Sequence, residues 1–211
     1  MNQKLSPNSI HFYKGMHHIQ IMKITQLKKS LLLGIVLLYN LTSTQANIKN
    51  PSFEKDKINS ERQIVQKLGN WEITSGNVEL ITSKVFPSAD GGQVLDLNGD
   101  QPGSIIQTIK GLDKSANYTL KFAYADQKSR KSKAEIMASA DIFINGEKVT
   151  TLRNLSPSPD YIDGIGFAFQ ATAKGTATIE FVSTTPGELG LVIDNLRIEE
   201  GLPLAPPVND R

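Results

Sequence analysis

Residues 141–150 read DIFINGEKVT and carry the strongest local structural signal in the chain. The dipeptide Asn145-Gly146 separates two short runs, 141–144 and 147–150, that alternate in polarity or contain β-branched residues. A two-residue type I′ turn requires positive φ at both central positions, which Asn and Gly adopt most easily. The stretch therefore predicts an antiparallel β-hairpin.

A second stretch, ANYTLKFAYAD at residues 116–126, shows the period of a half-buried strand. Large apolar side chains occupy every second position from Tyr118 to Tyr124, whereas Thr119 and Lys121 fall on the opposite face. Successive side chains of a strand point to opposite faces of a sheet, so this pattern indicates one face on a core and one toward solvent.

Similar short runs, separated by turns rich in Gly, Asn, Asp and Pro, follow along the chain and predict an all-β antiparallel sandwich. No stretch shows sustained helical periodicity, and the nearest, Ser60–Leu68, spans about two turns. The expected strands are Gln93–Asn98, Gly103–Lys110, Ala116–Asp126, Ala134–Asn145, Glu147–Leu152, Asp163–Ala171, Gly175–Ser183 and Leu189–Glu199, with shorter ones at Asn50–Glu54, Trp71–Thr74 and Val78–Ile81.

The segment Met22–Ala46 has the layout of a signal peptide: three lysines, an apolar run at 31–38 and a small-residue exit. We expect cleavage after Ala46. The apolar run is well short of the ~20 residues that a membrane-spanning helix needs, so no stable anchor is expected after cleavage. Residues 1–21 are expected to be an upstream extension, 47–200 a single β-sandwich domain and 201–211 an extended tail.

Composition excludes several kinds of chemistry. The first 46 residues hold five lysines, all three histidines and no acidic residue, which leaves 18 Lys and Arg against 21 Asp and Glu. A slightly acidic chain lacks the basic patch that nucleic-acid binding requires. The absence of cysteine, and of histidine after residue 46, excludes thiol or histidine catalysis and ordinary zinc sites. The cluster of Lys128, Arg130, Lys131 and Lys133 is interpreted as a solvated loop, with an anion or polysaccharide contact as the alternative.

Three polar residues occupy positions where strand alternation predicts an apolar side chain: Asp96, Gln107 and Asp194. Asp194 is in phase with Val192, Leu196 and Ile198, so it points toward the interior unless a bulge intervenes. A buried carboxylate needs partners. Two interpretations stay open, a ligand for a hard cation such as calcium and an acceptor for backbone N–H groups at a strand end.

Four motifs occur in order at domain-scale spacing: NPSFE at 50–54, LDLNG at 95–99, PGSIIQT at 102–108 and the dipeptide Asp194-Asn195. With them, the region from Asn47 to Glu199 resembles the DUF642 and choice-of-anchor C family. The resemblance implies a galactose-binding-like jelly-roll sandwich, shared with carbohydrate-binding modules, in exported or surface proteins. No sorting segment is visible after Glu200, so we expect a secreted protein, extracellular or periplasmic.

The resemblance also implies a structural calcium that joins the first strand to the last. Carried over to this sequence, the resemblance places Glu54 and Asp194 at one site, with backbone carbonyls near Asn50 and in the loop of Asp90 and Gly91 as further ligands. Oxygen ligands of this kind suit calcium.

The expected function is binding of a polysaccharide or glycan without catalysis. Sugar sites combine aromatic faces with side chains that hydrogen-bond hydroxyl groups. Trp71 is either such a face or part of the core, and Tyr161 is expected to be an exposed platform. One alternative is an adhesion or structural protein. Another is a glycoside hydrolase, which needs two carboxylates about 5 to 10 Å apart, and no such pair is marked in the sequence. The candidate sugar-binding residues are Tyr161, Trp71, Asn98, Asp100 and Arg153, with Phe86 as a further aromatic.

Overall fold

The computed structural model describes residues 47–126, 137–153 and 161–203. All of them belong to one compact unit, Gln45–Arg211. The predicted upstream extension, signal peptide and Ala46 cleavage site lie outside the described residues. So do the basic cluster at 128–133 and most of the predicted tail.

The described residues form eleven strands in two antiparallel sheets, and contain no helix. Every strand pairing is antiparallel, which confirms the predicted all-β class. The strands are β1 (Arg62–Val65), β2 (Glu72–Ser75), β3 (Val78–Thr82), β4 (Gln93–Asp96), β5 (Ser104–Lys110), β6 (Ala116–Asp126), β7 (Ser139–Ile144), β8 (Glu147–Arg153), β9 (Ile162–Gln170), β10 (Thr176–Ser183) and β11 (Leu191–Pro203).

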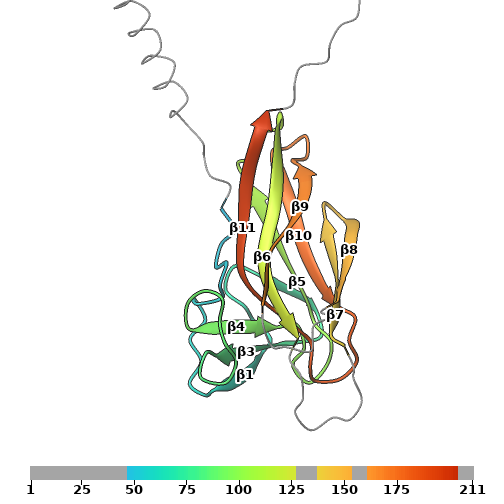
Figure 1. Ribbon diagram of the computed structural model, residues 1–211. Coiled ribbons are helices and arrows are strands. Elements are labelled where there is room, and N and C mark those ends of the chain that lie inside the picture. Colours follow the sequence, from blue (N-terminus) through green and yellow to red (C-terminus); the bar gives the residue numbers. More distant parts are fainter. Residues whose placement is uncertain (1–46, 127–136, 154–160, 204–211) are drawn as a thin grey trace, which may run out of the picture. The chain divides into compact units, whose positions relative to one another are not determined.

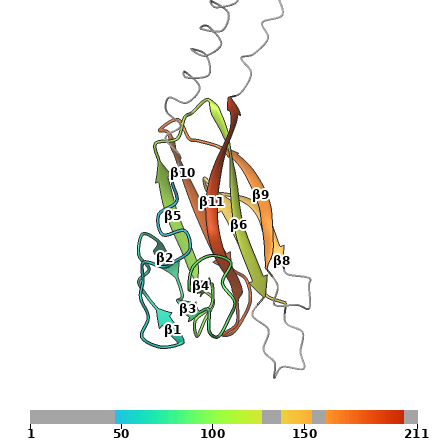
Figure 2. The same ribbon diagram turned by 60° about the vertical axis from the view of Figure 1, so that its left-hand side comes forward.

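The six-stranded sheet has the order β1-β3-β4-β11-β6-β9, and the five-stranded sheet has the order β2-β5-β10-β7-β8. Figure 1 shows β11 and β6 as long neighbouring strands with the shorter β4 and β3 beside their lower parts. In the turned view, β5 and β10 run alongside them in the second layer (Figure 2).

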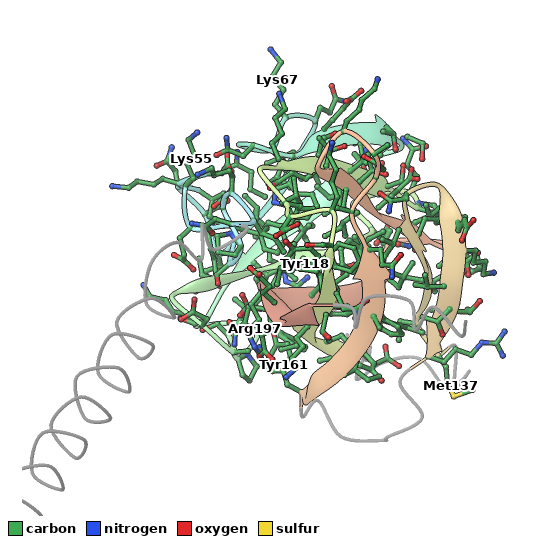
Figure 3. The ribbon with its side chains drawn as sticks, turned by 90° about the horizontal axis from the view of Figure 1, so that it is seen from above. Lys55, Lys67, Tyr118, Met137, Tyr161 and Arg197 are labelled. Atoms are coloured by element: carbon green, nitrogen blue, oxygen red, sulfur yellow. The ribbon has the colours of Figure 1, made fainter. Side chains whose placement is uncertain are left out.

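The main core lies between the two sheets. Leu120 and Phe122 of β6 are fully buried, as are Ile179 and Phe181 of β10, in one apolar cluster. The rings of Phe122 and Phe181 meet edge to face with centroids 5.1 Å apart, a favoured geometry for aromatic pairs. Figure 3 shows Tyr118 among the strands, with Lys67 extending away from them. The alternation predicted for 116–126 is confirmed.

The predicted hairpin is also confirmed as β7 and β8. Asn145 and Gly146 have φ values of 55° and 81°, as a type I′ turn requires. The Asn145 side chain strengthens the turn, because its Nδ2 donates to the carbonyl of Gln170 and its Oδ1 accepts from the backbone N–H of Thr178.

Ser60–Leu68, the nearest approach to a helical pattern, contains strand β1, and Arg62–Val65 pairs with β3 along its whole length. One local prediction was wrong. The predicted strand Asn50–Glu54 is a run of turns. Asn50 and Phe53 have φ values of 54° and 61°, and this folding carries the fully buried Phe53 ring into the core.

Gln107 explains how these turns stay in place. The side chain is buried, as strand phase predicted. Its Oε1 accepts from the backbone N–H of Lys49 at 2.7 Å, and its Nε2 donates to the carbonyls of Lys49 and Asn70. A buried amide therefore ties the N-terminal segment to β5.

A bulge in β11 corrects the predicted orientation of Asp194. The register against β6 shifts between Asp194 and Arg197, and Asn195 has a φ of 52°. Val192, before the bulge, belongs to a small apolar cluster on the outer face of the six-stranded sheet, whereas Leu196 and Ile198, after it, enter the main core. Asp194 thus shares the outer face with Val192, not the interior with Leu196.

In the part of the chain that the structure describes, no helix is long and apolar enough to cross a membrane.

Candidate functional site

Asp194 is fully buried, and backbone donors surround its carboxylate. Oδ2 accepts from the N–H groups of Ala89 at 2.7 Å and Asp90 at 2.9 Å, and Oδ1 accepts from the N–H of Asn195 at 2.7 Å. These bonds hold the loop between β3 and β4 against β11. The second interpretation of Asp194, an acceptor for backbone N–H groups, describes this arrangement.

Glu54 makes a similar connection from the N-terminal segment. Its Oε1 accepts from the N–H groups of Gly92 at 2.8 Å and Gln93 at 2.9 Å. Gly91 lies so close that a Cβ there would come within 2.4 Å of Glu54 Oε1, and its φ of 74° is also one that favours glycine. Asp90 completes the contact by accepting from the Ser52 hydroxyl at 2.6 Å.

Of the four predicted calcium ligands, three therefore meet at the 83–92 loop: Glu54, Asp90 and Asp194. The Asn50 side chain instead makes a separate set of contacts, donating to Asp56 and to the carbonyl of Gly69. Across residues 47–126, 137–153 and 161–203, no three His, Cys, Asp or Glu side chains are grouped closely enough to hold a metal ion. Glu54, Asp90 and Asp194 make hydrogen bonds at this loop, and their carboxylates are not grouped around a common point as metal ligands would be.

The environment of Asp194 changes its protonation. The pKa of Asp194 is raised to about 6, chiefly by burial and with a smaller contribution from the nearby Asp90 carboxylate. The three backbone hydrogen bonds act in the opposite direction. Burial together with the Asp194 charge also raises the pKa of Tyr161.

Trp71, a candidate sugar platform, lies in the core. It is 4% exposed, and its Nε1 donates to the carbonyl of Asn50 at 3.2 Å. Its ring contacts those of Phe53 and Phe181, with centroids 6.0 and 6.3 Å away. The ring offers no open face for a sugar, so the core interpretation replaces the platform.

Tyr161 also differs from the exposed platform that was expected. It is half-buried, its ring packs edge to face against Phe86, and its hydroxyl has no solvent contact and no hydrogen-bond partner. Both rings belong to the small outer cluster with Ile81 and Val94. Their packing explains why neither ring stands free.

Asn98 and Asp96 hold a different loop, the one between β10 and β11. Asn98 is fully buried, and its Nδ2 donates to the carbonyls of Thr185 and Gly187. Asp96 accepts from the N–H groups of Asn98 and Gly190. Burial raises the pKa of Asp96 to about 7, although both backbone hydrogen bonds lower it. Asn98 is therefore a loop anchor and presents no group to solvent.

Asp100 is exposed and fixed in place. Its carboxylate accepts from Asn77 Nδ2 at 2.6 Å, and its N–H donates to Asn77 Oδ1 at 3.0 Å. A carboxylate held in this way is available to an external hydroxyl group.

Arg153, the remaining candidate, is exposed at the end of β8 on the outer face of the five-stranded sheet. Asp141 shares that face and binds two neighbours: Lys148 Nζ lies 2.8 Å from its Oδ2, and the Thr151 hydroxyl donates to its Oδ1 at 2.7 Å. Burial alone would raise the pKa of Asp141, but the hydrogen bonds from Lys148 and Thr151 outweigh it, with help from the Arg153 charge, and the pKa is lowered.

A family model for DUF642, described as a protein of unknown function, matches residues 46–199. The chain belongs to the DUF642 family. It is also 28% identical over 181 residues to halomucin of Haloquadratum walsbyi, a match that covers 81% of this chain and 2% of that protein. The chain thus spans about 2% of the length of this curated relative.

The solved structures that are similar to the DUF642 domain include the following two. One is a cyclase from Fischerella sp. TAU in complex with 4-(1H-indol-3-yl)butan-2-one, with a TM-score of 0.54, 14% identity, and coverage of 77% of this chain and all of that one. The other is TmCBM61 in complex with beta-1,4-galactotriose, with a TM-score of 0.49, 13% identity, and coverage of 75% and 100%. At such identities the likeness concerns the fold alone.

The sequence did not predict the polar row, which comprises Asp141 on β7 and Lys148, Thr151 and Arg153 on β8. Asp141, Phe143 and Lys148 entered the prediction only as parts of a hairpin, although alternation with Ile142 and Ile144 places Asp141 and Phe143 on the outward face. That alternation was the available signal. The contact between Lys148 and Asp141 needed the actual strand register, which a bulge in β8 alters.

Proposed function

We propose that this DUF642 domain is an exported, non-catalytic carbohydrate-binding module. The observation that carries the proposal is the polar row on the outer face of β7 and β8, where Asp141 is fixed between Lys148 and Thr151 beside the exposed Arg153. Fixed donors and acceptors on an open surface suit hydroxyl-rich ligands, because little ordering is needed on binding.

The fold is consistent with this function. Two antiparallel sheets enclose one core and leave the outer face of the five-stranded sheet polar. The galactose-binding-like jelly roll and the choice-of-anchor C relationship, both expected from sequence motifs, belong to the proposal. So does the glycan partner.

Affinity electrophoresis tests the proposal directly. The purified chain is run through native gels that contain galactan, xylan, mannan, β-glucan, pectin or alginate, beside a non-binding marker protein. Retardation by at least one polysaccharide is the expected result. Free migration in every gel would contradict sugar binding and favour the adhesion alternative, whereas new reducing ends in the same polysaccharides would show a hydrolase.

The proposal also includes a structural calcium at the 83–92 loop. Glu54, Asp90 and Asp194 support it, because carboxylates from the N-terminal segment, the loop and the last strand each make a hydrogen bond at the 83–92 loop. Hard cations such as calcium are bound by carboxylate and carbonyl oxygens, six to eight in number.

Chelation distinguishes a bound metal from hydrogen bonds alone. If calcium is bound, EDTA lowers the melting temperature of the wild-type chain, excess calcium restores it, and Asp194→Ala abolishes the response. Glu199→Ala, on the same strand but exposed and paired with Lys121, should respond as the wild type does. A melting temperature that EDTA leaves unchanged would remove Glu54, Asp90 and Asp194 from the ligand set.

A further inference from the structure

Phe143 is an aromatic residue on the outward face of the five-stranded sheet. It lies between Ile142 and Ile144, both of which point into the main core, so strand alternation turns its ring the other way. The ring is half-buried, and within the described residues it belongs neither to the main core cluster nor to the small outer cluster. Core packing therefore does not account for an aromatic residue at this position.

Charged side chains flank Phe143 on both neighbouring strands. Lys148 is its register partner on β8, and Glu180 is its partner on β10. Lys148 lies opposite Phe143, and its ammonium group reaches Asp141, two residues earlier on the same face of β7, with Nζ 2.8 Å from Oδ2. The Lys148 side chain therefore runs beside the Phe143 ring.

A bulge in β8 lies opposite Phe143 in the strand register. Ile142 pairs with Thr150 and Phe143 pairs with Lys148, which leaves Val149 as the extra residue. Val149 is 39% exposed. Bulges change the direction of side chains and are frequent near binding sites.

The local charges decide which ligand suits this surface. Among the described residues on this face, Asp141 and Glu180 carry two negative charges and Lys148 and Arg153 carry two positive charges, so these four charges cancel. A neutral sugar ring presents C–H groups on one face, which stack on an aromatic ring, and hydroxyl groups at its edge, which accept from cations and donate to carboxylates.

We propose that Phe143 is the stacking platform of a binding site for a neutral pyranose unit of a glycan, with Asp141, Lys148 and Arg153 as hydrogen-bond partners of its hydroxyl groups. This inference rests on the proposed function and adds the location of the site and the class of sugar. It places binding on the sheet face of the hairpin and not at Asp100, which belongs to the β4–β5 loop.

Variants at Phe143 test the site in gels that contain galactan, xylan, mannan or β-glucan. Phe143→Ala should weaken the retardation of the full chain by about tenfold in apparent Kd, as expected when an aromatic contact is lost. Phe143→Tyr keeps the ring and should bind within about twofold of the wild type. Thr108→Ala, on the same sheet face two strands away, is the matched control and should bind as the wild type does.

A second variant tests the site even if Phe143→Ala does not fold. Lys148 and Arg153 are both exposed, so the double variant Lys148→Ala with Arg153→Ala should fold normally, as circular dichroism melting would show, and bind at least fivefold more weakly. Unchanged binding of this double variant would overturn the inference, and so would unchanged binding of a folded Phe143→Ala.

The outcomes separate the inference from the function on which it rests. A wild-type chain that binds no polysaccharide contradicts both. Binding by the wild type that is lost in Asp100→Ala but kept in Phe143→Ala leaves the proposed function intact and contradicts the site. Retardation by pectin or alginate alone, without any neutral polysaccharide, would contradict the assignment of a neutral sugar.

Discussion

Asp96 and Asp194 are fully buried carboxylates, and both accept hydrogen bonds from the backbone of loops. Asp194 holds the 83–92 loop, and Asp96, with Asn98, holds the loop between β10 and β11. At the scale of single residues, these buried side chains present no group to a glycan at the surface. They fix loop positions, and the exposed residues that remain free to bind lie elsewhere.

Strand phase identified these residues as unusual, but it could not show what they bind. Two of the three N–H groups that bind Asp194 lie more than a hundred positions earlier in the chain, and no local pattern encodes them. The sequence left open whether a bulge separates Asp194 from Leu196, since an Asn at positive φ leaves no mark on hydrophobic alternation.

The buried carboxylates predict a stability that falls as pH rises. Burial raises the folded-state pKa of Asp96 from 3.8 to about 7, so between these values the folded chain binds more protons than the unfolded one. The stabilisation is complete below about pH 4 and is lost as pH rises through 7. Asp194, with a pKa raised to about 6, acts in the same direction.

Denaturant unfolding at pH 5, 6, 7 and 8 checks this dependence. We expect the wild-type free energy of unfolding to fall by about 3 kcal/mol from pH 5 to pH 8 because of Asp96. Asp96→Asn should remove most of that slope, while Asp113→Asn, an exposed substitution, should keep it. A slope of the same size in Asp96→Asn would show that Asp96 is not responsible.

The β7–β8 hairpin is the element that the sequence predicted most sharply, because the conformational requirement of its turn is local. Its outward face was not predicted, because the bulge at Val149 and the ion pair across it follow from pairing between strands. The strand predicted at residues 50–54 was wrong for a related reason. Phe53 is buried by contacts with distant Trp71, which override the extended appearance of residues 50–54.

Gly146→Ala tests the turn. Gly146 has a φ of 81°, and no other atom lies within 4 Å of the position its Cβ would take, so the cost is purely conformational. We expect a loss of about 1 kcal/mol in the free energy of unfolding. Gly92→Ala, where φ is not positive and the nearest contact is 3.8 Å away, is the matched control and should cost less. Equal stability of Gly146→Ala and the wild type would contradict the type I′ turn.

At the scale of the whole molecule, the chain is a DUF642 protein whose described part is a two-sheet domain. The fold class, the positions of most strands and the family followed from alternation, turn residues and ordered motifs. Among the candidate sugar-binding residues, Asp100 and Arg153 are exposed, whereas Trp71, Asn98 and Tyr161 are held by packing or loop contacts.

Export belongs to this scale too and stays a prediction. Signal peptidase recognises the layout of the leader, a basic stretch, an apolar run and small residues, so Ala46 is the expected last residue removed. N-terminal sequencing of protein recovered from outside the cytoplasm should begin at Asn47. Recovery of a chain that still begins at Met1 or Met22 would contradict export with cleavage.

Carbohydrate binding is the central claim, and affinity electrophoresis in polysaccharide gels tests it most directly. The account predicts that the wild-type chain is retarded by at least one neutral polysaccharide and releases no reducing sugar from it. Free migration of the folded chain in all the gels, with or without added calcium, would contradict the claim.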